Sequence, residues 1–242
     1  MSAALVVDSV SKSFRLKHTQ TFKDLTGRSS RRKADVEMVH ALRDVSLEVR
    51  QGEGVALMGL NGSGKSTLLK LMSGVMRPDD GTVLVRGRVA GLIEIGAGMS
   101  PELTGRENVY LNAAILGMTK AETEAKFDAI VDFAGIERFL ETEVKFYSSG
   151  MFMRIAFSVA IHTEPDVFLV DEVLAVGDSQ FKRKCRRALL ARRRDGLTLI
   201  IVAHESSLLR KLCTRGVVLD EGALVYDGVL AGAEALINDD DD

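Results

Sequence analysis

The sequence contains no tryptophan, and its two cysteines, Cys185 and Cys213, lie far apart among 242 residues. Neither has a second cysteine or a histidine at metal-ligand spacing, so we predict no zinc site and no disulfide framework. Long apolar runs are also lacking, because nowhere do about 18 apolar residues follow one another without a charge. Residues 1–8 hold no basic region followed by a long apolar stretch, so no leader segment is expected. We expect reduced, partly buried thiols in a chain that does not itself span a membrane.

Net charge is also small, at −2, with a pI of about 6.1. Such a balance provides no overall attraction to nucleic acid or to an anionic lipid surface. The chain is 46% hydrophobic and 27% charged, a composition with which a folded cytosolic protein buries a sizeable core. Partners must therefore be inferred from individual sites rather than from bulk charge.

Residues 3–7 and 41–49 alternate apolar and polar side chains, as half-buried strands do. Between them lies a polar, mostly basic insertion at about 15–38, which includes Arg28, Arg31, Arg32 and Lys33. We interpret this insertion as a solvated loop on a sheet edge. Contact with phospholipid or ligand phosphates is the alternative.

The rest of the chain alternates between strand and helix patterns. A strand at 55–58 precedes a helix at 65–72, and strands at 167–170 and 197–202 alternate with further helices. A helical lobe at about 100–163 interrupts this order, with helical spacing at 106–133 broken at Gly117. The order predicts one α/β domain over residues 1–238, with a mostly parallel sheet covered by helices. The acidic tail 239–242 is expected to be disordered.

The first chemical motif follows the pattern G-x-x-x-x-G-K-[ST], the P-loop. Its nucleotide-binding residues are Gly59, Asn61, Gly62, Ser63, Gly64, Lys65, Ser66 and Thr67. Glycines let consecutive backbone N–H groups turn toward phosphate oxygens, and the next helix adds its positive end. Lys65 is predicted to reach the β- and γ-phosphates, and the Ser66 hydroxyl to bind Mg²⁺. A plain glycine-rich turn is the weaker alternative, because the loop joins an apolar strand to a helix.

The second motif is the apolar run 167–170, which ends in Asp171 and Glu172. Open α/β sheets place their ligands at the carboxyl ends of strands, where these acids come. We predict that Asp171 belongs to the Mg²⁺ shell and that the catalytic base Glu172 polarises a water for attack on the γ-phosphate. Taken alone, such a pair is more often a surface or capping feature. Together with the P-loop the catalytic interpretation is the stronger.

Between these motifs, Tyr147-Ser148-Ser149-Gly150-Met151 stands directly before a helical pattern at 152–161. Small residues at a helix N-terminus leave N–H groups exposed for a phosphate contact, and a serine there also caps the helix. At this point the sequence resembles the ABC ATPases, whose LSGGQ signature occupies the same place. The resemblance implies an ABC-type P-loop ATPase domain with a mostly parallel core sheet, an antiparallel β subdomain and a helical subdomain. It also implies ATP and Mg²⁺ as cofactors.

The family order assigns further residues. His204, after the strand at 197–202, matches the switch histidine that senses the γ-phosphate, and Asp178 matches the aspartate of the D-loop. Phe14 matches the aromatic residue on which adenine stacks. His18, His40 and His162 receive no role.

Most members of the family carry a Q-loop glutamine in the region of Gly91 to Gly98, where this chain has Glu94 instead. By its place in the order, Glu94 is the nearest equivalent. A carboxylate there can reach Mg²⁺ or the attacking water through its oxygens.

The runs 92–109 and 171–178, with the YSSGM signature, resemble exporters of polysaccharide, O-antigen and teichoic acid, over nearly the whole chain. That resemblance implies two copies of this subunit and two copies of a membrane permease, moving an undecaprenyl-diphosphate-linked glycan. It places the subunit at the cytoplasmic face of a bacterial inner membrane. The two subunits would pair head to tail, with Ser148, Ser149 and Gly150 of one closing the ATP site of the other. We expect no additional glycan-binding domain after the ATPase region, and we therefore expect the permease to handle the glycan.

Other functional classes fit the sequence less well than an exporter ATPase does. Related ATPases of DNA repair carry a long coiled coil between the two motifs, for which this chain has no room, and translation-type members hold two ATPase units. The basic run 182–194 has no interleaved aromatic residues, so a solvated helix face is favoured over nucleic acid. A binding-only regulator remains an alternative, against which the presence of Asp171, Glu172 and His204 argues.

Overall fold

The computed structural model describes residues 2–17, 36–92, 98–171, 178–203 and 205–239. Its core is a six-stranded sheet in the order β5-β6-β7-β3-β8-β9. The strands are β3 (Gly54–Met58), β5 (Val89–Leu92), β6 (Val167–Val170), β7 (Thr198–Ile201), β8 (Arg215–Asp220) and β9 (Ala223–Val229). All neighbours run parallel except β8 and β9, which are antiparallel. The prediction of a mostly parallel sheet is confirmed.

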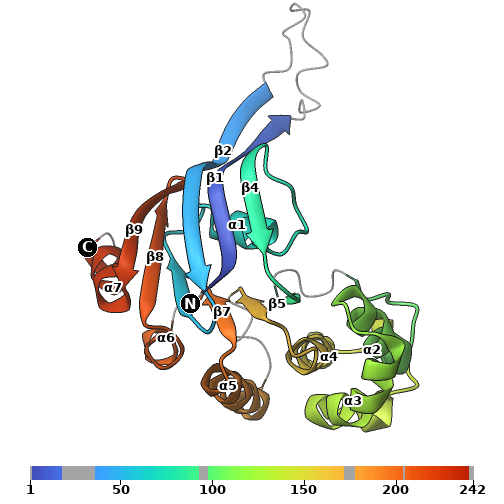
Figure 1. Cartoon of the computed structure of the whole chain (residues 1–242). Helices are drawn as coiled ribbons and strands as arrows, with labels where there is room; N and C mark the ends of the chain where they lie inside the picture. Colours follow the sequence, from blue (N-terminus) through green and yellow to red (C-terminus); the bar gives the residue numbers. More distant parts are fainter. Residues whose placement is uncertain (1, 18–35, 93–97, 172–177, 204, 240–242) are drawn as a thin grey trace, which may run out of the picture.

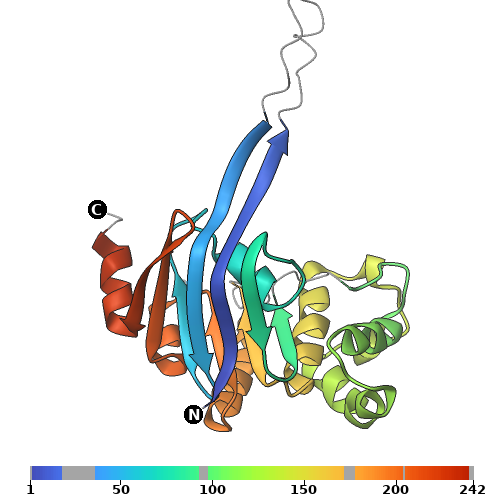
Figure 2. The same cartoon turned by 45° about the horizontal axis from the view of Figure 1, so that its top comes forward.

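A second, antiparallel sheet has the order β2-β1-β4, with β1 (Ala3–Lys17), β2 (Val36–Arg50) and β4 (Asp80–Val85). Strands β1 and β2 are longer than their alternating patterns predicted, so both ends of the basic insertion belong to strands. Figure 2 shows these ends projecting together beyond the rest of the sheet. Residues 18–35, the remainder of the insertion, lie outside the described residues.

Helix α1 (Lys65–Met72) packs between the two sheets, and its buried leucines share one apolar core with both. Leu5 of β1, Leu42 of β2, Leu69 of α1 and Leu169 of β6 are all fully buried in this core. The other face of the parallel sheet is covered by α4 (Ser149–His162), α5 (Ser179–Arg194) and α6 (Ser206–Leu212). Figure 1 shows this layer order, with α7 (Leu230–Asp239) beside β8 and β9.

The helical lobe consists of α2 (Gly105–Ile115) and α3 (Lys120–Ala134), packed against α4 around a separate apolar core. Each helix begins with a capping box, Thr104 with Glu107 and Thr119 with Glu122. Each reciprocal pair satisfies two backbone donors that would otherwise lack partners, which is why both helices start where they do. The expected break at Gly117 is confirmed. Over the stretches that the structure describes, no helix has the length and apolar character needed to cross a membrane.

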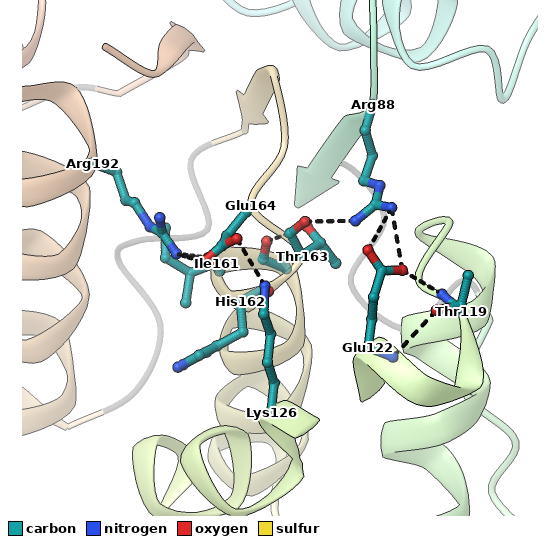
Figure 3. A network of polar contacts seen from close by, with 10 residues as sticks. Arg88, Thr119, Glu122, Lys126, Ile161, His162, Thr163, Glu164 and Arg192 are labelled. Carbon is teal, nitrogen blue, oxygen red and sulfur yellow. Dashed lines mark hydrogen bonds and ion pairs between the residues drawn. The ribbon is translucent and has the colours of Figure 1, made fainter. Parts of the chain in front are cut away.

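A polar network joins this lobe to the sheet where β5 begins (Figure 3). Arg88 donates to the Thr163 carbonyl at 2.9 Å and pairs with Glu122 of α3 at 3.2 Å. Glu164 pairs with Lys126 of α3 at 2.9 Å and with Arg192 of α5 at 3.1 Å. Charged contacts therefore connect α3 of the lobe to the segments next to β5 and α4.

Both cysteines are free and buried. They belong to the apolar core between the parallel sheet and helices α4, α5 and α6. Desolvation raises the pKa of each thiol to about 12. The thiols are more deeply buried than the expected partial burial, as is typical of structural cysteines.

Replacing Leu169 by alanine tests the shared core, because this residue is 0% exposed in β6, an interior strand of the parallel sheet. We expect Leu169→Ala to lower the free energy of unfolding by about 2–5 kcal/mol through lost burial and the cavity left behind. The matched control is Leu84→Ala in β4, where the side chain is 64% exposed. Its effect should stay within about 0.5 kcal/mol. Urea denaturation of both variants measures the difference, and equal losses would contradict the assignment of the core.

Candidate functional site

The glycine-rich loop between β3 and α1 has a backbone that only glycine adopts readily. Gly59, Gly62 and Gly64 have φ of 139°, 87° and 105°. A Cβ on Gly59 would lie 2.2 Å from the Leu219 carbonyl oxygen, and one on Gly64 would lie 2.5 Å from that of Ala41. The loop is thus pressed against β8 on one side and β2 on the other.

Helix α1 starts at Lys65 after Gly64, which supplies no side-chain cap among the described residues. Its first backbone N–H groups are therefore left for a ligand, and the helix dipole favours an anion there. Lys65 is 8% exposed, and its ammonium donates to the carbonyls of Gly59 at 2.7 Å and Leu60 at 2.8 Å. The Ser63 hydroxyl oxygen is buried with no hydrogen-bond partner in the described part of the chain. These features suit a phosphate group.

A cavity of about 440 Å³ opens beside this loop. It is lined by Val39, His40, Ala41, Asn61, Gly62, Gly64, Lys65, Ser66, Thr67 and Asp171. Most of the predicted P-loop residues are thus brought together with Asp171, which follows the last residue of β6. The Ser66 hydroxyl and the Asp171 carboxylate are oxygen donors of the kind that Mg²⁺ prefers. The cavity therefore fits a nucleotide with its magnesium ion.

Three β2 residues in this lining, Val39, His40 and Ala41, were not predicted. Phe14 is paired with Val39 across the β1–β2 ladder, while Phe14 itself is half-buried and is not among the described lining residues. Lys12 places its ammonium 5.9 Å from the centre of the Phe14 ring. His40 Nδ1 lies 2.9 Å from the Ser13 hydroxyl. Pairing across the long ladder brings β2 to the cavity, and no local motif in the sequence marks it.

The signature residues lie at the start of α4. Ser148 caps this helix, and its hydroxyl accepts a hydrogen bond from the Met151 N–H at 3.2 Å. Ser148 and Ser149 are exposed, and Gly150 is half-buried. Among the described residues that line the cavity, none comes from α4. The capping interpretation therefore holds, and within one chain these residues are apart from the P-loop cavity.

Asp178 caps α5, accepting hydrogen bonds from the N–H groups of Gln180 and Phe181, both at 2.9 Å. It also forms an ion pair with Arg154 of α4. The pKa of Asp178 is lowered to about 2. The hydrogen bond from the Phe181 N–H is the largest cause, and the hydrogen bond from the Arg154 guanidinium is the second. This predicted nucleotide-binding residue does not line the described cavity, and its contacts in the chain tie α4 to α5.

Three predicted site residues, Glu94, Glu172 and His204, lie outside the described residues. Their predicted roles remain predictions. The strands that precede them in the sequence are β5, β6 and β7, which are adjacent parallel strands.

Comparison with known proteins identifies relatives across most of the chain. A family profile described as ABC transporter matches residues 42–175. The ABC transporter protein AbcA of Aeromonas salmonicida is 49% identical over 81% of this chain and 64% of its own length. The O-antigen export system ATP-binding protein RfbB of Klebsiella pneumoniae is 44% identical over 76% of this chain and 75% of its own length.

The teichoic acids export ATP-binding protein TagH of Bacillus anthracis is 39% identical over 92% of this chain, which spans 40% of that relative. The chain thus spans less than two thirds of several relatives that it matches. Among solved structures, a dimeric ATP-binding cassette in a post-hydrolysis state with ADP and Pi has a TM-score of 0.74 at 23% identity. That alignment covers 93% of this chain and 98% of the other, and it shows a shared fold.

Replacing Gly59 by alanine tests the geometry of the loop. Gly59→Ala introduces both a left-handed backbone cost and a clash with the Leu219 carbonyl at 2.2 Å. The control Gly62→Ala carries the backbone cost alone, about 1–2 kcal/mol, because no described atom lies within 4 Å of its Cβ. We expect the first variant to lose clearly more free energy of unfolding, measured by denaturant titration without nucleotide. Equal losses would show that the close approach to β8 is unimportant.

Proposed function

This chain belongs to the ABC transporter family, and on that premise we propose that it is an ATP-binding and ATP-hydrolysing subunit of a glycan exporter. The observation that carries the proposal is the cavity in which the P-loop meets Asp171. Its volume of about 440 Å³ lies within the roughly 300–1,000 Å³ typical of pockets for small ligands and cofactors. The buried cation and the oxygen donors inside it match a magnesium nucleotide.

Lys65 and the start of α1 are proposed to bind the phosphate chain. The ammonium now donates to two loop carbonyls, so it is held within reach of the β- and γ-phosphates that would occupy the loop. Ser66 and Asp171 would hold Mg²⁺, which neutralises phosphate charge when bound. Glu94 is a further proposed contact to that ion. Phe14 or its neighbour on β2, Val39, would provide the apolar surface for the base.

Hydrolysis is proposed to depend on Glu172 and His204. Glu172 would accept a proton from a water as the water oxygen bonds to the γ-phosphorus and the bond to the β–γ bridging oxygen breaks. The products are ADP and inorganic phosphate. His204 would sense the γ-phosphate by donating a hydrogen bond to it. Asp171 directly precedes Glu172, which supports a position at the same edge of the sheet.

A second copy is proposed to complete each site. Ser148, Ser149 and Gly150 form an exposed helix start that is apart from the cavity of their own chain. In a head-to-tail dimer with two-fold symmetry, each copy would offer this helix start to the phosphate held by the other. Asp178 forms an ion pair with Arg154 of the same helix, α4, and would support this contact between the copies. A solved cassette of the same fold is dimeric in two structures, which supports this arrangement.

The transported substrate is proposed from the relatives. Their names specify export of O-antigen and of teichoic acids, which are glycans. We infer a substrate carried on undecaprenyl diphosphate and two copies of a membrane permease, with this subunit peripheral on the cytoplasmic face of a bacterial inner membrane. Separation of the dimer after hydrolysis would drive the permease.

Removal of the P-loop cation tests nucleotide binding. We expect Lys65→Ala to weaken binding of magnesium ATP by about 10- to 100-fold, because a charge-assisted contact to phosphate is lost. Isothermal titration with a non-hydrolysable analogue measures this change. Lys120→Ala, at an 83% exposed side chain on α3, is the control and should bind normally. Unchanged affinity in Lys65→Ala would refute the proposed site.

Replacement of the catalytic base tests hydrolysis separately. We expect Glu172→Gln to keep ATP binding while phosphate release by the permease complex falls about 10²- to 10⁴-fold. The variant should then accumulate as an ATP-bound dimer in size-exclusion chromatography. Turnover at the wild-type rate would remove Glu172 from the mechanism, and no turnover in the wild-type complex would favour a binding-only regulator.

A further inference from the structure

Helix α5 is unusually basic, with lysine or arginine at eight of its 16 positions. Some of these cations serve the fold. Lys184 donates to the carbonyls of Asp132 and Phe133, both at 3.1 Å. Arg193 donates to three backbone carbonyls and Arg192 pairs with Glu164. The other cations of the helix are not explained by packing of this kind.

A cavity of about 190 Å³ lies between α5 and α6. It is lined by Arg183, Arg186, Arg187, Leu190, Glu205, Ser207, Leu208 and Lys211. Four of these residues are cations and one is an acid. The two leucines supply apolar surface between them. Within the described parts of the chain, this cavity shares no lining residue with the proposed nucleotide cavity.

The single acid in the cavity is already engaged. Glu205 accepts a hydrogen bond from the Ser207 hydroxyl at 2.8 Å and forms an ion pair with Arg186. The Ser207 hydrogen bond is the main cause of a lowered pKa for Glu205, so this carboxylate stays ionised. It offsets one positive charge and leaves an excess of three. The cavity is therefore a small region of positive potential.

Arg183 and Arg187 both line this cavity and are both exposed. Neither has a hydrogen bond or ion pair within the described residues. They lie four residues apart on one face of α5, where like charges repel and slightly destabilise the helix. Arg186, between them, has its Nε atom buried without a partner among the described residues. A buried donor without an acceptor costs free energy that an added acceptor would recover. Three neighbouring guanidiniums thus lack a full set of acceptors.

We propose that this cavity binds a phosphate group, separately from the nucleotide site. Guanidiniums match phosphate oxygens in a bidentate geometry, so an oxyanion would both satisfy their donors and relieve their mutual repulsion. The volume is below the roughly 300 Å³ at which pockets for drug-sized ligands begin, so it suits one or two phosphate groups. A free polyphosphate and the headgroup of an anionic phospholipid share this chemistry. Nucleic acid is not favoured, because no aromatic residue is among the described residues that line the cavity, and base stacking needs one.

Titration of the full-length chain with pyrophosphate tests the site. The nucleotide site is first saturated with magnesium and a non-hydrolysable ATP analogue, so that binding there does not contribute. We expect the double variant Arg183→Gln/Arg187→Gln to weaken pyrophosphate binding at least about tenfold by calorimetry. The matched control, Lys182→Gln/Arg194→Gln, removes two charges from the same helix at residues that do not line the cavity. It should bind pyrophosphate as the wild type does.

A vesicle arm separates the two sources of phosphate. Flotation with phosphatidylserine vesicles, compared with phosphatidylcholine vesicles, is measured for the same variants. Binding to anionic vesicles that is lost only with Arg183 and Arg187 identifies a headgroup, whereas pyrophosphate binding without vesicle binding identifies a free phosphorylated ligand. If neither probe binds the wild type, or if both double variants lose binding equally, the site does not exist. Thermal unfolding midpoints check that each variant is folded. Lys211→Gln removes a further cation from the same cavity and should also weaken pyrophosphate binding.

Discussion

The close approach of the glycine-rich loop to the two sheets is the constraint on which the candidate site depends. Gly59 touches the backbone of β8 and Gly64 touches that of β2, so the loop is shaped by both sheets at once. Helix α1 packs its leucines into the core that the same sheets share. Because the loop, its following helix and both sheets form one packed unit, the shape of the proposed phosphate-binding loop is set by the packing of the chain itself.

The helices next to the remaining proposed site residues are connected by charged contacts around this unit. Arg154 of α4 meets Asp178 at the start of α5, and Arg186 of α5 meets Glu205 at the start of α6. These surface ion pairs each contribute little free energy, but they fix how the helix starts are oriented. Helix α5 therefore links the helix that carries the signature serines to the helix that follows His204.

Helix α5 also shows why composition is a poor guide to role. A basic helix face is expected to be solvated. Arg193 nevertheless donates hydrogen bonds to backbone carbonyls, and Arg192 forms an ion pair with Glu164. Arg183, Arg186 and Arg187 instead line a cavity with α6. The same residue type thus serves packing at some positions of a helix and leaves unsatisfied donors at others. Position relative to neighbouring elements decides between the two.

Local patterns in the sequence determined most of the fold and the centre of the site. Helix α1 and strand β6 have the bounds that their patterns predict, and the P-loop lies between a strand and a helix, because these features depend on neighbours along the chain. Tertiary structure alone decided that Val39 and His40 line the cavity, that β1 and β2 extend into the basic insertion, and that Asp178 pairs with Arg154. These outcomes depend on strand register and helix packing between distant segments, which are set by side chains far apart in the chain and leave no local pattern.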